Sequence, residues 1–394
     1  MKKRILFVDD ERDLLNGLRR ALRGQRKEWE MTFVGSGKEA LELAESNPFD
    51  AIVTDMRMPG MDGAQLLEEL VHLQPDIVRI VLSGQSDKEM VMKSVLPAHQ
   101  YLNKPCDIDH LKNAIIRAFA LRELIHDDKL VALISGMESL PSLPSLYLKL
   151  VGMLQDSDVT VRAVGEMLAK DLAMTSKVLQ LVNSAFFGLG RRITNPVDAA
   201  SLLGMNVIKG LVLSIGIFSQ CDQSKLQSQG FSVDRLWAHS SKVASIAKRI
   251  AVAEHAEKSV VEDSMLAGFL HDIGKLILAL NLPEILQQLQ MASQDGGLAG
   301  LHHAEEMALG TTHGGVGAYL LGLWGLPEGV VSAVAFHHDP GALPDAEFSA
   351  LTAVHVADVL ANDDASDGYD FDHDYLQRLG IEDRIEAWRQ LALE

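Results

Sequence analysis

The sequence predicts an α/β domain with a parallel sheet, followed by an all-helical domain. Up to about residue 122, short apolar runs of strand length alternate with amphipathic helical patterns. After about residue 137, apolar residues recur at spacings of three and four, and no alternating run of strand length stands out. A length of 394 residues also exceeds what one core usually supports. We therefore expect two domains joined by a short connection.

The N-terminal part contains five predicted strand-and-helix units. The predicted strands are 4–8, 31–35, 49–55, 78–84 and 100–105. The predicted helices begin near Arg12 and then cover 37–45, 63–73, 88–96 and 108–124. Because the strands are apolar on both faces, helices should cover both sides of the sheet. This predicts a flavodoxin-like, doubly wound sheet of five parallel strands in a domain over 1–122.

Polar residues occur where four of these strands end. Asp9 and Asp10 end the first strand, Asp55 the third, Ser83 the fourth and Lys104 the fifth. In a parallel sheet the carboxyl ends of the strands meet at one edge, where ligands bind. Carboxylates gathered there suit Mg²⁺, and Asp55 is then placed to accept a phosphoryl group. The alternative for any single residue is a helix cap or a turn.

The motifs "FVDDE", "VTDMRMPGMDG", "VLSG" and "YLNKP" resemble the receiver domain of two-component response regulators. The resemblance implies that a cognate histidine kinase phosphorylates Asp55. It also implies that Mg²⁺ is bound by Asp9, Asp10, Asp55 and the backbone carbonyl of Arg57, and that Ser83, Tyr101 and Lys104 sense the phosphoryl group. The segment "SVLPAHQYL" departs from the Gly-containing turn usual in the family, which makes the neighbouring helix surface harder to predict.

A helical linker is predicted over 123–136, since the helical pattern of the last helix of the first domain continues toward "DDKLVALI". An apolar stripe along this segment has heptad spacing, but Arg122 and Lys129 interrupt it. A homodimer through this stripe is one possibility, and an ordinary amphipathic helix followed by a linker is the other.

The remaining residues, 137–394, are predicted to form about a dozen helices. The segment "KDLAMTSKVLQLVNSAFFG" and its surroundings resemble the HDOD domain, a regulatory relative of the HD phosphohydrolases, from about 138 to 361. Before residue 230, the residues alone would indicate only a helical packing module.

Histidine and aspartate residues recur on apolar helices of this half, so we expect their side chains to face inward. Buried groups of this kind need partners, and imidazoles with carboxylates suit Zn, Mn or Fe. The candidate ligands are His239, His271, Asp272, His313, His337, His338 and Asp358. Lys275 follows His271 by one helical turn and is a candidate phosphate contact. The alternative is a set of hydrogen-bonded core residues. We interpret His302 and His355 as surface or structural residues.

The candidate ligands resemble those of the HD superfamily and of its HD-GYP cyclic-dinucleotide phosphodiesterases. Two departures stand out: Arg235 occupies the turn before His239, where those enzymes offer an acidic ligand, and "HHDPGALPD" lacks the GYP segment. These departures favour a non-catalytic output domain that regulates a downstream signalling protein. A metal-dependent phosphohydrolase and a non-catalytic metal or nucleotide sensor stay open as alternatives.

The composition restricts the environment and the partners. A net charge of −18 argues against nucleic acid as the main ligand, because phosphate backbones require clustered Lys and Arg. No apolar stretch approaches the length of a membrane span or signal peptide, so we expect no membrane association. Two distant cysteines, Cys106 and Cys221, fit a reducing cytoplasm.

Overall fold

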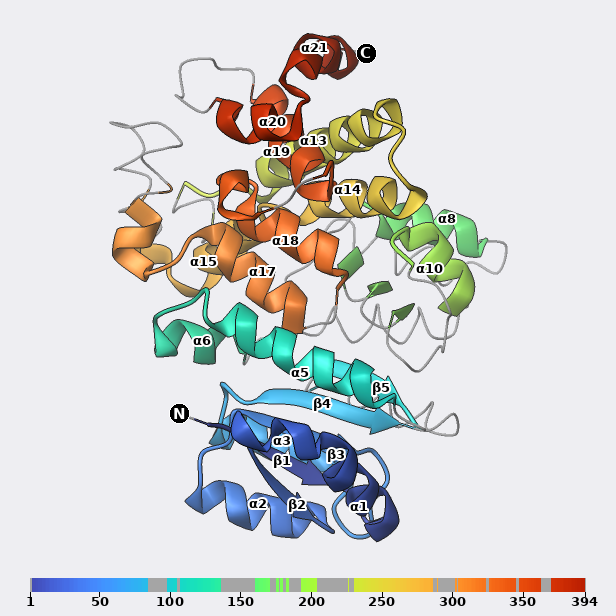
Figure 1. Cartoon of the computed structure of the whole chain (residues 1–394), viewed down its shortest axis with the longest axis vertical. Coiled ribbons are helices and arrows are strands. Elements are labelled where there is room, and N and C mark those ends of the chain that lie inside the picture. The colour runs from blue at the N-terminus through green and yellow to red at the C-terminus, as the bar shows by residue number, and fades with distance from the viewer. Residues whose placement is uncertain are drawn as a thin grey trace.

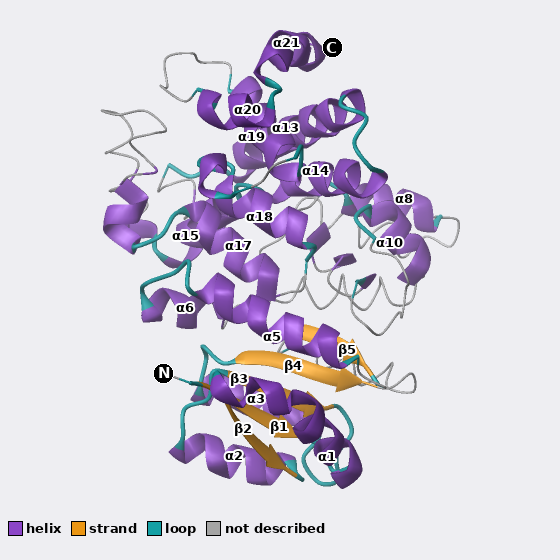
Figure 2. Cartoon of the chain, in the orientation of Figure 1, coloured by secondary structure: helices purple, strands orange, loops and turns teal. Residues whose placement is uncertain are grey.

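The computed structural model has a sheet-containing N-terminal part and a helical C-terminal part, stacked along the long axis of the molecule (Figure 1). The structure describes residues 2–83, 98–104, 107–135, 160–170, 175–176, 178–179, 182–183, 193–203, 226, 230–285, 289, 302, 304–323, 326–344, 347–362 and 370–393. Figure 2 shows the arrows of the labelled strands at the N-terminal end of the chain. The predicted combination of an α/β domain with a mostly helical remainder is confirmed.

The sheet has the order β2-β1-β3-β4-β5, and all its strand pairs are parallel. Its strands are β1 (Lys3–Val8), β2 (Trp29–Val34), β3 (Ala51–Asp55), β4 (Val78–Ser83) and β5 (Gln100–Asn103). Strand β3 is buried at all of its residues, as expected for a strand covered on both faces. The register pairs Val8 with Thr54 and Asp55 with Leu82, so the acidic ends of β1 and β3 reach the same edge.

Helices of the N-terminal part are fixed by local signals. They are α1 (Arg12–Ala21), η1 (Leu22–Lys27), α2 (Gly37–Ser46), α3 (Gly63–Leu73) and α5 (Ile108–Arg122). The Ser36 side chain caps α2 by accepting from the Glu39 amide, and Asp62 forms a capping box with Gln65 at the start of α3. The predicted helix over 88–96 lies outside the described residues.

The C-terminal part is built from helices that pack around one another. They are α8 (Val161–Leu168), α10 (Pro196–Leu203), α13 (Val233–Ala253), α14 (Lys258–Leu270), α15 (Ile273–Asn281), α17 (His313–Leu323), α18 (Glu328–Phe336), α19 (Ala350–Ala361), α20 (His373–Leu379) and α21 (Ile385–Leu393), with the short η3 (Pro340–Ala342) and η4 (Glu382–Arg384). Helix α17 is buried at every residue. Within the part of the chain that the structure describes, none of the helices is long and apolar enough to cross a bilayer.

The segment that connects the two parts is not one continuous helix. Helix α5 ends at Arg122, and a separate helix, α6 (Asp128–Ser135), follows after a short turn. The expectation that the last receiver helix runs on through the linker is therefore wrong: the Glu123, Leu124 and Ile125 amides bond to carbonyls three residues earlier, which closes the helix. Helices α5 and α6 lie between the sheet and α17 (Figure 1) and contact α17.

Candidate functional site

An acidic site lies at the carboxyl edge of the sheet. Asp9 follows β1 and Asp55 ends β3, and both are buried. The Lys104 ammonium lies 2.7 Å from Asp9 Oδ2 and 2.7 Å from Asp55 Oδ1. One carboxylate oxygen each from Asp9, Asp10 and Asp55 lies within 4.8 Å of the others, so the three could share one cation.

Burial and ion pairing set the charges at this edge. Burial raises the pKa of Asp55, and Lys104 only partly offsets this. Burial also lowers the pKa of Lys104, but hydrogen bonds to Asp55 and Asp9 outweigh it and the pKa lies above its usual value. Lys104 therefore stays a cation beside the carboxylate that would accept a phosphoryl group.

The path of the backbone after Asp55 requires a glycine. A Cβ atom on Gly63 would lie 2.2 Å from the Asp55 carbonyl oxygen, so only glycine lets α3 begin this close to β3. The Gly63 amide donates to the Met56 carbonyl at 3.0 Å. Ser83 ends β4 and Tyr101 lies in β5, but their side chains lie outside the described residues. Arg57 is exposed two residues beyond Asp55.

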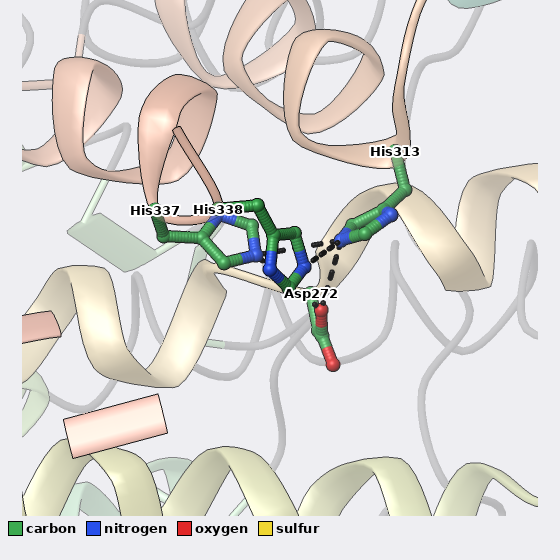
Figure 3. A group of neighbouring side chains, drawn as sticks. All are labelled: Asp272, His313, His337 and His338. Atoms are coloured by element: carbon green, nitrogen blue, oxygen red, sulfur yellow. Dashed lines mark hydrogen bonds and ion pairs between the residues drawn. The ribbon is translucent and has the colours of Figure 1, made fainter. Parts of the chain in front are cut away.

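All seven predicted ligands of the helical half come together in one centre. They come from five places: His239 from α13, His271 and Asp272 from the α14–α15 junction, His313 from the start of α17, His337 and His338 from the end of α18, and Asp358 from α19. Figure 3 shows three of the imidazoles converging near Asp272.

The two oxygens of Asp272 face different ligand sets. Asp272 Oδ1 lies 3.2 Å from His313 Nε2 and 3.9 Å from His337 Nε2. Asp272 Oδ2 lies 3.5 Å from His271 Nε2 and 3.8 Å from His239 Nε2. A carboxylate between two groups of imidazoles is the arrangement needed to bridge two cations.

Hydrogen bonds at the rear of the imidazoles aim their Nε2 atoms inward. The Nδ1–H of His271 donates to the Gly268 carbonyl at 2.8 Å, and that of His337 to the Val334 carbonyl at 2.9 Å. His313 Nε2 then lies 3.4 Å from His337 Nε2 and 3.2 Å from His338 Nε2. Lone pairs aimed at one another repel unless a proton or a cation lies between them, so this geometry suits a metal.

Glu305 is a member of the centre that sequence analysis missed. Its buried carboxylate accepts from His313 Nδ1 at 2.7 Å and from the His313 backbone amide at 2.9 Å. A carboxylate behind a ligand histidine fixes the ring and makes it a stronger ligand. The only sequence signal is an acidic residue eight positions before His313, which is too common to be informative.

The charges of the centre are strongly coupled. Burial lowers the pKa of His313, but the Glu305 carboxylate and a hydrogen bond to Asp272 together more than offset this and raise it to about 9. Burial and the neighbouring imidazoles hold the pKa values of His337 and His338 well below the usual range. These two rings are therefore neutral at pH 7, which is the form that binds a metal.

The two aspartates are held as anions. Burial raises the pKa of Asp272, but the Lys275 ammonium together with the His271 and His313 side chains outweighs this, and the pKa lies well below the ordinary value. Burial likewise raises the pKa of Asp358, and hydrogen bonds from His239 and His271 bring it well below that value. Anionic carboxylates beside the neutral His337 and His338 imidazoles form part of a donor set that fits divalent Mn, Fe or Zn.

A cavity of about 260 Å³ opens beside the centre. It is lined by Asp272, Asp358, His239, His338, Lys275, Arg235, Phe231, Ser232, Leu236 and Asn362. Lys275 Nζ lies 2.8 Å from Asp272 Oδ2, and Arg235 is exposed at the mouth. The positively charged side chains of Lys275 and Arg235, next to the predicted metal ligands, favour an anionic ligand in the cavity.

Two further histidines of this half are not among the ligand groups. His355 is buried, and its Nδ1 donates to the His337 carbonyl at 2.8 Å while its Nε2 accepts from the Asp372 amide at 2.9 Å. It thus supports the backbone of a predicted ligand. The His302 ring lies 5.5 Å from the His338 ring, between centroids.

Comparison with known families places both parts of the chain. Residues 140–340 match the HDOD domain, and residues 5–116 match the response regulator receiver domain. An uncharacterized protein of Treponema pallidum is 27% identical over 218 residues, which cover 55% of this chain and 41% of that protein. The hydrogenase transcriptional regulatory protein HoxA of Cupriavidus necator is 38% identical over 125 residues, which cover 31% and 25%.

Among solved structures, the MmoQ response regulator of Methylococcus capsulatus is similar to this chain at 22% identity with a TM-score of 0.49. The similarity covers 65% of this chain and 98% of that one. The chain spans less than half the length of the curated relatives named above.

Proposed function

Because the chain belongs to the HDOD family and carries a response regulator receiver domain, we propose that it is a phosphorylation-controlled signalling protein whose helical half is a two-metal phosphohydrolase. A histidine kinase would phosphorylate Asp55, with Mg²⁺ held by Asp9, Asp10 and Asp55. The receiver domain would then control the histidine and aspartate centre.

The observation that carries the output function is the position of Asp272. Its two oxygens face two ligand sets, one with His313 and His337 and the other with His239 and His271. A single structural metal would need only one such set. The seven ligands and Glu305 therefore fit a pair of divalent ions better than a hydrogen-bonded core, and this moves our interpretation from a non-catalytic output toward chemistry.

Bound divalent ions would supply a nucleophilic water at neutral pH and Lewis-acid stabilisation of a phosphoryl oxygen. The protein's own residues account for the rest. Lys275 and Arg235 line the cavity and would bind the non-bridging oxygens of a phosphate ester. Glu305 would hold His313 in place, while the buried walls of α15, α17 and α18 exclude bulk water.

The test is metal content together with hydrolysis by the full chain. Protein dialysed against Mn²⁺ should retain two equivalents in the helical half and hydrolyse bis(p-nitrophenyl) phosphate. Asp272→Ala should lose both properties, whereas His72→Ala, at an exposed position on α3, should keep them. If folded wild-type protein retains no Mn²⁺, the two-metal assignment fails.

A non-catalytic module is the second candidate, and Arg235 is the observation that favours it. An arginine cannot bind a metal, and it lies one helical turn before His239 at the cavity mouth. Such a site would bind metal and a phosphate-containing ligand, or a downstream protein, without turnover. Retention of Mn²⁺ without hydrolysis of any phosphate ester would support this candidate.

The receiver function is tested separately. With Mg²⁺ present, acetyl phosphate should label the wild-type chain but not Asp55→Asn. Lys104→Ala should still be labelled, because the acceptor carboxylate remains, but should fail to change the helical half. Labelling of Asp55→Asn at the wild-type level would refute Asp55 as the acceptor.

A further inference from the structure

We infer that α17 is the mechanical link through which the receiver domain controls the metal centre. This inference rests on the proposed function, and it concerns how the centre is regulated. Helix α17 begins at His313, a predicted ligand, and its other end contacts α5 of the receiver domain. A displacement of α5 would therefore move a ligand of the centre.

At its N-terminal end, α17 packs backbone against backbone on the elements that carry other ligands. A Cβ on Gly274, two residues after Asp272, would lie 1.9 Å from the His313 carbonyl oxygen. A Cβ on Gly314 would lie 2.8 Å from the Val334 carbonyl oxygen, three residues before His337. Because no side chains lie between these backbones, a displacement of α17 would also displace the neighbouring segments that carry Asp272 and His337.

Along another side, α17 packs on the end of the receiver domain. A Cβ on Gly322 would lie 1.9 Å from Leu121 Cδ1, at the end of α5. Further toward the centre, a Cβ on Gly315 would lie 3.8 Å from the Leu124 carbonyl oxygen, and one on Gly310 would lie 3.3 Å from His126 Cβ. The segment from Leu121 to His126 therefore follows α17 from its last turn to Gly310, three residues before His313.

Hydrogen bonds tie the same helix end to the sheet. The Gln100 side chain, on β5, donates to the Gly322 carbonyl at 3.1 Å. Arg117, on α5, donates to the Leu326 carbonyl just beyond α17. Because the last carbonyls of a helix lack partners within it, the Gln100 side chain satisfies an acceptor at Gly322 that would otherwise be buried without a bond.

A buried polar network provides a second tie, through α6. Arg79, on β4, donates to the Ser135 carbonyl at 2.5 Å, and His99 Nε2 lies 2.8 Å from the same oxygen. The Ser135 hydroxyl lies 3.0 Å from the Tyr319 hydroxyl on α17. All four side chains are fully buried or nearly so, and a buried network of this kind favours one discrete arrangement over a gradual range.

The geometry thus connects β4 and β5 to a metal ligand through one helix. Arg79 and Gln100 lie at the amino ends of these strands, and the carboxyl ends of the same strands flank the phosphoacceptor edge. Eleven residues at about 1.5 Å each give α17 a length of roughly 16 Å between the receiver contact and His313. Phosphorylation can change the metal centre only as far as the two arrangements of α17 differ in their affinity for metal.

The experiment measures the affinity of the full chain for Mn²⁺ by equilibrium dialysis, with excess Mg²⁺ to fill the receiver site. Affinities are compared with and without beryllofluoride, which mimics a phosphoryl group on Asp55. Hydrogen exchange of the 313–323 amides, measured in the same samples without Mn²⁺, reports on α17 independently of metal. The uncoupling variant is Gln100→Ala/Tyr319→Phe, and the control is Ile116→Ala, which alters an exposed residue of α5.

Beryllofluoride should change the dissociation constant of Mn²⁺ by about fivefold or more in the wild type, the lower end of typical allosteric coupling. It should also change the exchange of the α17 amides. Both effects should persist in Ile116→Ala and disappear in Asp55→Asn and in Gln100→Ala/Tyr319→Phe. The uncoupling variant should keep the wild-type Mn²⁺ affinity when beryllofluoride is absent, because it alters no ligand.

The outcomes separate this inference from the proposed function. Mn²⁺ binding that does not respond to beryllofluoride would overturn the link and leave the metal centre standing. An exchange response of α17 without Mn²⁺ binding would support the link and refute the two-metal proposal. A full response in Gln100→Ala/Tyr319→Phe would show that coupling follows another route and would also overturn the inference.

Discussion

Glu305 provides the sharpest test of the metal centre, because it touches a predicted ligand but would not itself bind the metal. We expect Glu305→Ala to weaken Mn²⁺ binding by about 10- to 100-fold, the usual effect of losing a carboxylate behind a ligand histidine. This corresponds to about 1.4 to 2.7 kcal/mol. Glu305→Gln should lie nearer the lower end: an amide oxygen at the position of Oε2 keeps both bonds to His313, at 2.7 and 2.9 Å, and loses only the charge.

The pH dependence gives the same test a second readout. Burial lowers the pKa of His313, but the Glu305 carboxylate and a hydrogen bond to Asp272 raise it to about 9, so at pH 7 a proton must leave this ring before a metal binds. Wild-type affinity should therefore increase by up to tenfold per pH unit as the pH rises toward 9. In Glu305→Gln the increase should level off at lower pH, because the charge that raised the pKa is gone.

The assay is equilibrium dialysis of Mn²⁺ at pH 8, with Mg²⁺ in excess and the fold checked by circular dichroism. Glu306→Gln is the matched control, because it makes the same change at the next residue, which is exposed. If folded Glu305→Ala binds Mn²⁺ within twofold of the wild type, Glu305 does not support a metal ligand and our reasoning about the centre is wrong.

Three further expectations follow from the same geometry. Gly274→Ala should destabilise the protein by about 1 to 3 kcal/mol in urea unfolding, because a Cβ there would lie 1.9 Å from the His313 carbonyl oxygen; an unchanged midpoint would contradict the close packing of α15 on α17. The pKa values of Asp272 and Asp358 lie well below the ordinary value, so their stabilisation is complete above about pH 4 and is lost as the pH falls through the folded pKa values. The urea midpoint should therefore decrease below about pH 4, and the decrease should be smaller in Asp358→Asn. Finally, Lys275→Met should raise the Michaelis constant for bis(p-nitrophenyl) phosphate by a larger factor than it lowers the Mn²⁺ content, since Lys275 lines the cavity beside the ligands. If the Mn²⁺ content falls by the same factor as the Michaelis constant rises, Lys275 has a purely structural role.

The amino-acid sequence by itself determined the division into an α/β part and a helical part, and it identified the ligand candidates. Hydrophobic periodicity is a local property, so strands such as β3 could be recognised directly. Residues such as His271 and Asp272 stood out for a related reason, because burying a polar pair inside an apolar run is costly without a partner.

Only the tertiary structure decided how these residues meet. Glu305 carries no distinguishing local pattern, and its importance arises because the fold brings it behind His313. The break after Arg122 and the contact of Gly322 with Leu121 likewise depend on packing between segments about 200 residues apart. Such contacts are set by shape and by the satisfaction of buried polar groups across the whole fold, and no short stretch of sequence contains that information.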